Sequence, residues 1–140
     1  MTLTLLAIGI LGTVSTIRSN YRASFDVGNQ DQAHFALETA IATLRSVNFS
    51  ALRSLYQDKP LKVLCRMGGT PQMIDVQVHF DTNETALPAA YGPVADLDGD
   101  GALSTTDVSA RYSLLPARLT VTYGTSYGTE TRTMYLVLAP

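Results

Sequence analysis

Apolar residues dominate the start of the chain, and neither a charge nor a proline occurs between Met1 and Ile17. A helix rises about 1.5 Å per residue, so this stretch would be roughly 25 Å long, at the short end of what crosses a bilayer core. Polar residues follow without a turn signal, and the first proline is Pro60. The pattern predicts helix from residue 1 to about residue 56, with a weak point at Gly28 and Asn29.

A second apolar pattern begins within the same predicted helix and has helical spacing. Its members recur every three or four residues: Ala33, Leu37, Ala40, Ile41, Leu44 and Val47. Polar side chains, among them Glu38 and Arg45, take the other side. This stripe must pack on another part of the fold, and the downstream half of the chain is the candidate.

Beyond Pro60 the pattern changes to the two-residue period of strands. The run Leu61–Cys65 is apolar, and a turn is indicated from Gly68 to Pro71. From Met73 to Asp81 apolar and polar side chains alternate, which predicts a half-buried antiparallel strand with His79 on its solvent side.

The last part of the chain predicts a loop, a short helix and a hairpin. Pro88, Gly92 and Pro93 favour a loop over residues 82–95. One or two helical turns are expected from Val108 to Leu115, stopped by Pro116. The β-branched and aromatic segments 119–123 and 131–138 then predict a β-hairpin.

These elements predict an α+β fold. A long N-terminal helix packs its second half on an antiparallel sheet of three or four strands, while its apolar first half protrudes uncovered. We expect residues 1–30 to form the stem helix with its polar transition, and residues 31–140 to form one globular domain.

Composition narrows the function classes. With 140 residues, a net charge of −2 and a pI of about 5.5, the chain lacks the basic patch of a nucleic-acid-binding protein. Cys65 is the only cysteine, which excludes an intrachain disulfide, and its apolar surroundings predict a buried hydrophobe rather than a nucleophile. No motif of a serine hydrolase, zinc protease or phosphate-binding loop occurs, so no enzyme activity is expected.

The apolar start has a second interpretation, as a secretory signal peptide. No basic residue precedes it, Arg18 and Arg22 follow it, and an Ala-x-Ala cleavage site is missing, so a retained helix is favoured. In an ordinary membrane anchor the same two arginines would favour a cytoplasmic body.

The most specific local signal is an acidic loop with the spacing of a calcium-binding loop. Aspartates stand at positions 1, 3 and 5, with Gly101 at the sharp turn and Leu103 where an apolar residue packs such loops on a core. The predicted oxygen ligands of one structural Ca²⁺ are Asp96, Asp98, Asp100, Ala102 through its carbonyl, Ser104 through water, and Asp107.

The alternative to a calcium site is an acidic surface turn without metal, which the repulsion among four carboxylates disfavours. The prolines before the loop exclude an entering helix, so a helix–loop–helix sensor is not expected. The loop is similar to one half of a dockerin repeat, whose second copy is missing here.

Three phrases of the sequence resemble the type IV pilin-like proteins, that is, minor pilins and type II secretion pseudopilins. These are Leu6-Ala-Ile-Gly-Ile-Leu-Gly12, the amphipathic segment Ala36–Arg45, and the closing strands around Leu119–Tyr123 and Arg132–Leu136. Leu5 stands where that family usually has a glutamate.

The resemblance implies a structural subunit with no catalytic role. Such a subunit is held in the inner membrane before assembly and then packs with copies or relatives of itself in an extracellular filament or periplasmic pseudopilus. The implied assembly residues are Leu3, Leu5, Leu6, Ile8, Gly9, Ile10, Leu11, Gly12, Val14 and Ile17. The alternative is a secreted or membrane-anchored calcium-dependent adhesion module.

Overall fold

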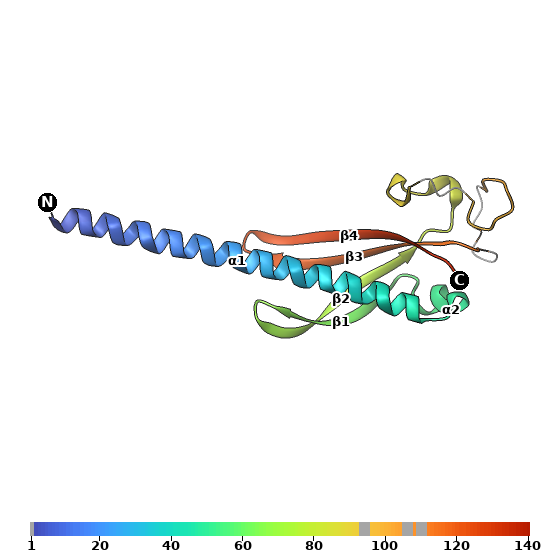
Figure 1. The fold of residues 1–140 in the computed structure, drawn as a ribbon, viewed down its shortest axis with the longest axis horizontal. Coiled ribbons are helices and arrows are strands. Elements are labelled where there is room, and N and C mark those ends of the chain that lie inside the picture. The colour runs from blue at the N-terminus through green and yellow to red at the C-terminus, as the bar shows by residue number, and fades with distance from the viewer. Residues whose placement is uncertain (1, 93–95, 105–107, 109–111) are drawn as a thin grey trace.

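A long helix and a four-stranded sheet make up the fold (Figure 1). The computed structural model describes residues 2–92, 96–104, 108 and 112–140, with side chains from Thr13 onward. Its elements in chain order are α1 (Thr2–Ser46), α2 (Phe49–Tyr56), β1 (Lys59–Met67), β2 (Thr70–Phe80), η1 (Glu84–Ala86), η2 (Ala89–Tyr91), β3 (Leu115–Thr125) and β4 (Gly128–Leu138). The predicted α+β class is confirmed.

The sheet is an antiparallel meander in which neighbours in sequence are neighbours in space, in the order β1-β2-β3-β4. The β1–β2 turn uses Gly68 and Gly69, whose φ angles of 58° and 84° suit glycine. The β3–β4 turn is the two-residue loop Ser126–Tyr127, with Thr125 opposite Gly128. Both predicted strand regions and the closing hairpin are therefore confirmed, with longer strands than expected.

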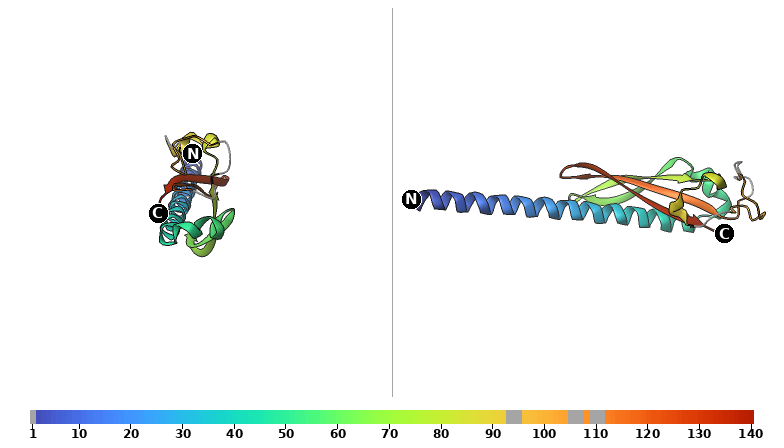
Figure 2. Two further views of the ribbon diagram at one scale, coloured as in Figure 1. Left: turned by 90° about the vertical axis from the view of Figure 1, so that its right-hand side faces the viewer. Right: turned by 90° about the horizontal axis from the view of Figure 1, so that it is seen from above.

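The second half of α1 covers one face of this sheet (Figure 2). Three alanines, Ala33, Ala36 and Ala40, are fully buried and bring the helix close to the strands, while Leu37 and Leu44 fill the space between them. From the sheet side the core residues include Val76, Val78, Leu119 and Val121. The predicted stripe on α1 is confirmed, with Ile41 and Val47 partly buried at its edge.

The first half of α1 extends past the end of the sheet as a rod (Figure 1). The side chains of residues 13–24 are exposed, and contact with the sheet begins at Phe25 and Asp26. Some 23 residues thus lie beyond the sheet, a length of about 35 Å. From Thr13 onward, where side chains are described, no helix combines the length and apolarity needed to cross a membrane.

The predicted weak point of α1 is wrong, because the helix continues through Gly28 and Asn29. Asn29 is only 3% exposed and bridges both hairpins. Its amide nitrogen donates to the carbonyl of Gly124 at 2.9 Å, and its Oδ1 accepts from the N–H of Gly68 at 2.8 Å. The helix instead breaks at Asn48, whose side chain caps α2 by accepting from the N–H of Ser50.

Pro71, expected in a turn, and Pro116, expected to stop a helix, lie inside strands instead. Pro71 belongs to β2, opposite Arg66, and Pro116 belongs to β3, opposite Val137. The ladder between β2 and β3 ends at Ala117, so Pro116 needs no N–H on that side. The helix expected before Pro116 is also wrong for the described residues, because residues 112–114 form a bend. Residues 109–111 lie outside the described part.

Asn29→Ala should lower the free energy of unfolding by about 1–2 kcal/mol, because two backbone groups lose their partner at the point where α1 leaves the sheet. Gln30→Ala, at the next position of the same helix, is the control and should change it by less than about 0.5 kcal/mol. Urea denaturation of the full chain in mild detergent measures both. Equal losses in the two variants would contradict the role given to Asn29.

Candidate functional site

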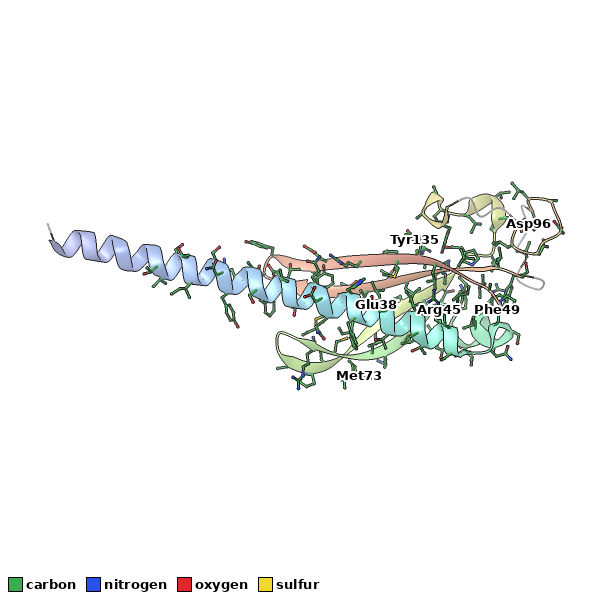
Figure 3. All side chains as sticks on the ribbon, viewed as in Figure 1. Glu38, Arg45, Phe49, Met73, Asp96 and Tyr135 are labelled. Carbon is green, nitrogen blue, oxygen red and sulfur yellow. The ribbon has the colours of Figure 1, made fainter. Side chains whose placement is uncertain are left out.

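The acidic loop lies at the end of the molecule opposite the N-terminus, as the label on Asp96 shows (Figure 3). Asp96 organises its backbone. Oδ1 accepts from the N–H groups of Gly99 at 2.6 Å and Asp100 at 3.2 Å, and Oδ2 accepts from Gly101 at 2.8 Å. These donors, that of Gly101 first, lower the pKa of Asp96 and favour the carboxylate.

Leu97 anchors the loop to the rest of the fold. Its side chain is fully buried, and its carbonyl accepts from the N–H of Ser113 at 2.6 Å and of Leu114 at 3.0 Å, just before β3 begins. The packing role expected for Leu103 is wrong, because Leu103 is 58% exposed. The loop is therefore held at its second position rather than its eighth.

Glu84 joins the loop from outside it. This residue begins η1 and is only 5% exposed. Its Oε1 accepts from the N–H of Leu97 and its Oε2 from the N–H of Ser104, each at 2.5 Å. The two ends of the described part of the loop are thus tied to one buried carboxylate.

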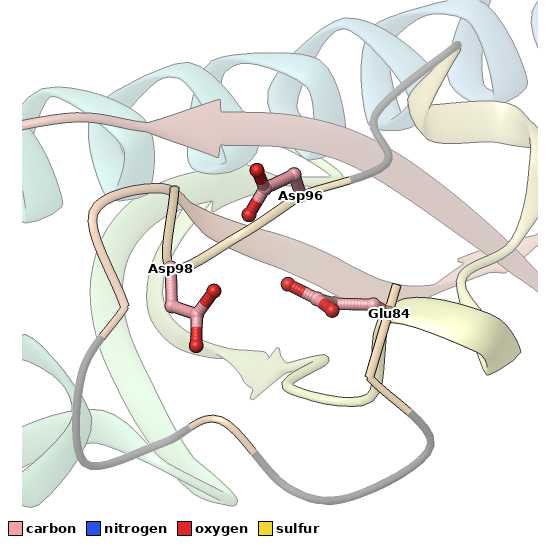
Figure 4. A group of neighbouring side chains, drawn as sticks. All are labelled: Glu84, Asp96 and Asp98. Atoms are coloured by element: carbon pink, nitrogen blue, oxygen red, sulfur yellow. The ribbon is translucent and has the colours of Figure 1, made fainter. Parts of the chain in front are cut away.

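Glu84, Asp96 and Asp98 bring their carboxylates together (Figure 4). One oxygen of each lies within 4.8 Å of the others, so this acidic cluster can hold a metal ion. Three carboxylates in so small a space repel one another without a cation, and carboxylate oxygens are the donors that hard divalent cations prefer.

The other predicted ligands have different surroundings. Asp100 accepts from the N–H of Ala102 at 2.8 Å and is not in the three-carboxylate cluster. Ala102 is exposed, the N–H of Ser104 is directed at Glu84, and Asp107 lies outside the described residues. Sequence reasoning missed Glu84 because it precedes the loop by a dozen residues, in a segment without periodicity.

A second polar cluster surrounds His79 on β2, which was expected to face solvent. Its ring is 40% exposed and lies between two carboxylates, with Nδ1 at 2.6 Å from Asp58 and Nε2 at 3.2 Å from Asp81. Only a doubly protonated ring donates on both sides. Asp81 also accepts from the hydroxyl of Tyr91 at 2.6 Å, and burial raises the pKa of that hydroxyl, so it stays a donor.

Cys65 is buried on β1, as predicted, with its thiol directed at the carbonyl of Gln32 at 3.7 Å. Burial raises the pKa of this thiol, which disfavours the reactive thiolate.

The structure describes part of the predicted assembly surface. Val14 and Ile17 are 56% and 68% exposed on the protruding half of α1. The backbone of the remaining assembly residues is helical, and their side chains lie outside the described part: Leu3, Leu5, Leu6, Ile8, Gly9, Ile10, Leu11 and Gly12.

The chain matches no protein-family model, no curated protein and no solved structure.

Asp58→Asn should destabilise the protein by less than about 1 kcal/mol, because the pair with His79 is largely exposed. The hydrogen bond from His79 holds the pKa of Asp58 below its usual 3.8. The contribution of this carboxylate is therefore complete above pH 3.8 and is lost as the pH falls through the lower folded-state value. Asparagine also tolerates the φ of 55° at this position.

Melting curves of the parent and Asp58→Asn should differ at pH 6, approach each other as the pH falls below 3.8, and converge once the pH is below the lower folded-state pKa. Asp75→Asn, which removes an exposed partner of Lys62, controls for the loss of a surface carboxylate. A gap between parent and Asp58→Asn that persists unchanged in acid would refute the pairing.

Proposed function

We propose that this protein is a structural subunit of a helical filament, of the kind formed by type IV pilin-like proteins, and that it assembles through the protruding half of α1. The observation that carries the proposal is the placement of this helix. It is one continuous element of 45 residues, and its packing on the sheet ends near Phe25, so that the preceding half protrudes beyond the sheet (Figure 1).

The composition of the exposed half supports burial against other helices. It carries no charge up to Ile17, and Gly9 and Gly12 permit close approach of another helix backbone. The eight leucine, isoleucine and valine side chains between Leu3 and Ile17, at roughly 1–3 kcal/mol each, would offset the ordering cost of assembly. In this proposal the stem rests in the inner membrane before assembly and in the core of an extracellular filament or periplasmic pseudopilus afterwards.

The division of α1 also supports assembly without unfolding. The apolar side chains of residues 33–44 are already buried against the sheet. The stems can therefore bundle while the core of the globular body stays buried. The acidic loop lies at the far end of the body from the stem (Figure 1). In a bundle of parallel stems this loop would lie at the end of each subunit farthest from its N-terminus.

The cation proposed for the acidic cluster is Ca²⁺. The cluster offers only oxygen ligands, and the loop has the aspartate and glycine spacing of a calcium loop. Glu84, Asp96 and Asp98 would bind directly, with the other predicted loop positions completing the shell. The ion would be structural and would fix the long connection between β2 and β3.

A second candidate is a calcium-dependent binding module, favoured by the exposed Leu103 beside the acidic loop. The two candidates differ at the N-terminus. A filament subunit keeps the apolar helix in the mature protein, whereas a secreted module loses it.

Removal of detergent from the full chain should give filaments of uniform width in electron micrographs. Ile10→Asp should abolish them, because a charge in the bundled stem cannot be solvated. Leu55→Asp, an equally drastic change at a half-exposed position on α2, should leave them intact. Filaments that survive Ile10→Asp, or their absence from the parent, would contradict assembly through α1.

Calcium should raise the melting temperature, and chelation should lower it. At a free concentration of 100 times Kd, a single site stabilises by about 2.7 kcal/mol. Glu84→Gln and Asp96→Asn should remove most of this gain, while Asp75→Asn, a surface carboxylate outside the loop, should keep it. Identical melting curves with Ca²⁺ and with excess EDTA would refute a structural calcium site.

A further inference from the structure

Strand β4 forms an open edge of the sheet. The N–H of Asp81 donates to the carbonyl of Pro116, so the even-numbered residues of β3 direct their backbone groups toward β2. The odd-numbered residues of β3 therefore bond to β4, where their partners are even-numbered. It follows that five residues of β4 direct their N–H and C=O groups outward: Thr129, Thr131, Thr133, Tyr135 and Val137.

The opposite edge of the sheet is protected, whereas β4 is not. On β1, Pro60 has no N–H, and the N–H of Arg66 is taken by Oε1 of Gln32 at 2.9 Å. Within the described chain no hydrogen bond reaches the outward backbone groups of β4. η2 contacts β4, and its Tyr91 stacks edge to face on Tyr135, so the template for a further strand is the first part of β4, residues 128–134, which contains no proline, lysine or bulge.

The side chains of β4 restrict which strand can join. Glu130 and Arg132 lie on the helix side of the sheet, opposite Tyr123 and Val121, both buried. Arg132 has no hydrogen-bond or ion-pair partner among the described residues, and Glu130 accepts from the hydroxyl of Tyr123 at 3.0 Å. An added strand that places an apolar or like-charged residue beside these two would be disfavoured.

We infer that β4 pairs in antiparallel fashion with β4 of a second copy, about a two-fold axis at Thr131. In this register Glu130 of each copy stands opposite Arg132 of the other, in the pairs whose side chains approach most closely. Thr131 stands opposite itself and Thr129 opposite Thr133. Moving the axis by one residue in either direction sets Glu130 against Glu130 or Arg132 against Arg132, so charge favours this register over its two neighbours.

The position of α1 leaves room for this contact. The helix packs mainly over β1 and β3, and Met134 and Leu136 on the helix side of β4 stay only partly buried. The two helices would therefore be separated by both β4 strands of the joined sheet. Antiparallel pairing points the stems in opposite directions, so the dimer is a contact of dispersed subunits that lie outside both the membrane and the proposed filament.

Charge reversal in the full chain tests the pairing, with detergent keeping the stems apart. Glu130→Arg and Arg132→Glu should each weaken self-association about tenfold or more, because two attractive pairs become repulsive. An equimolar mixture of the two variants should form a 1:1 heterodimer, since every cross-strand pair is then complementary. Native mass spectrometry of mass-tagged copies distinguishes homodimers from heterodimers.

A backbone variant tests the hydrogen bonds separately. Thr131→Pro removes an outward N–H that the internal ladder does not use and should abolish the dimer, whereas Thr131→Ser should retain it. A parent chain that stays monomeric, or a mixture that forms no heterodimer beyond the level of either variant alone, would overturn the inference. Filament formation depends on the stem and should persist in these variants, so failure of the two proposals is distinguishable.

Discussion

The packing of α1 against the sheet is the constraint on which the other features depend. Three buried alanines let the helix approach the strands, and Leu37 and Leu44 fill the interface. The contact begins at Phe25 and Asp26 and includes the polar bridge made by Asn29, which joins the helix to both hairpin ends. Since a helix of 45 residues is much longer than this interface, the remainder has to protrude as a rod. The exposed stem is thus a consequence of where the packing starts.

The acidic loop belongs to the long connection between β2 and β3, at the end of the molecule opposite the stem. Because α1 covers a face of the sheet, this connection has to be supported by contacts of its own. Glu84 supplies part of that support by binding backbone N–H groups of Leu97 and Ser104. Because these hydrogen bonds hold Glu84 against the loop, its carboxylate also adds a third negative charge beside Asp96 and Asp98. In the proposed calcium site, loop order and cation affinity would therefore be linked through one buried side chain.

Much of the fold could be predicted because the spacing of apolar residues along the chain reflects which side chains are buried. The stripe on residues 33–47 and the alternation along β2 follow from this relation, as does the closing hairpin. The failures share a different cause. Asn29, Pro116 and Glu84 all act through partners distant in sequence, and a local rule treats each of them as a breaker, a stop or a surface residue. In the candidate metal site, Asp96 and Asp98 could be predicted from loop spacing, whereas Glu84 required the fold.

Hydrogen–deuterium exchange of the full chain, before and after assembly, tests most directly whether the protruding half of α1 is the assembling element. Amides of residues 5–24 should exchange quickly in the dispersed state and gain strong protection in the assembled state, while those of residues 33–44 should be protected in both. Assembly that leaves exchange in residues 5–24 unchanged, and instead protects only the sheet or the acidic loop, would contradict the account.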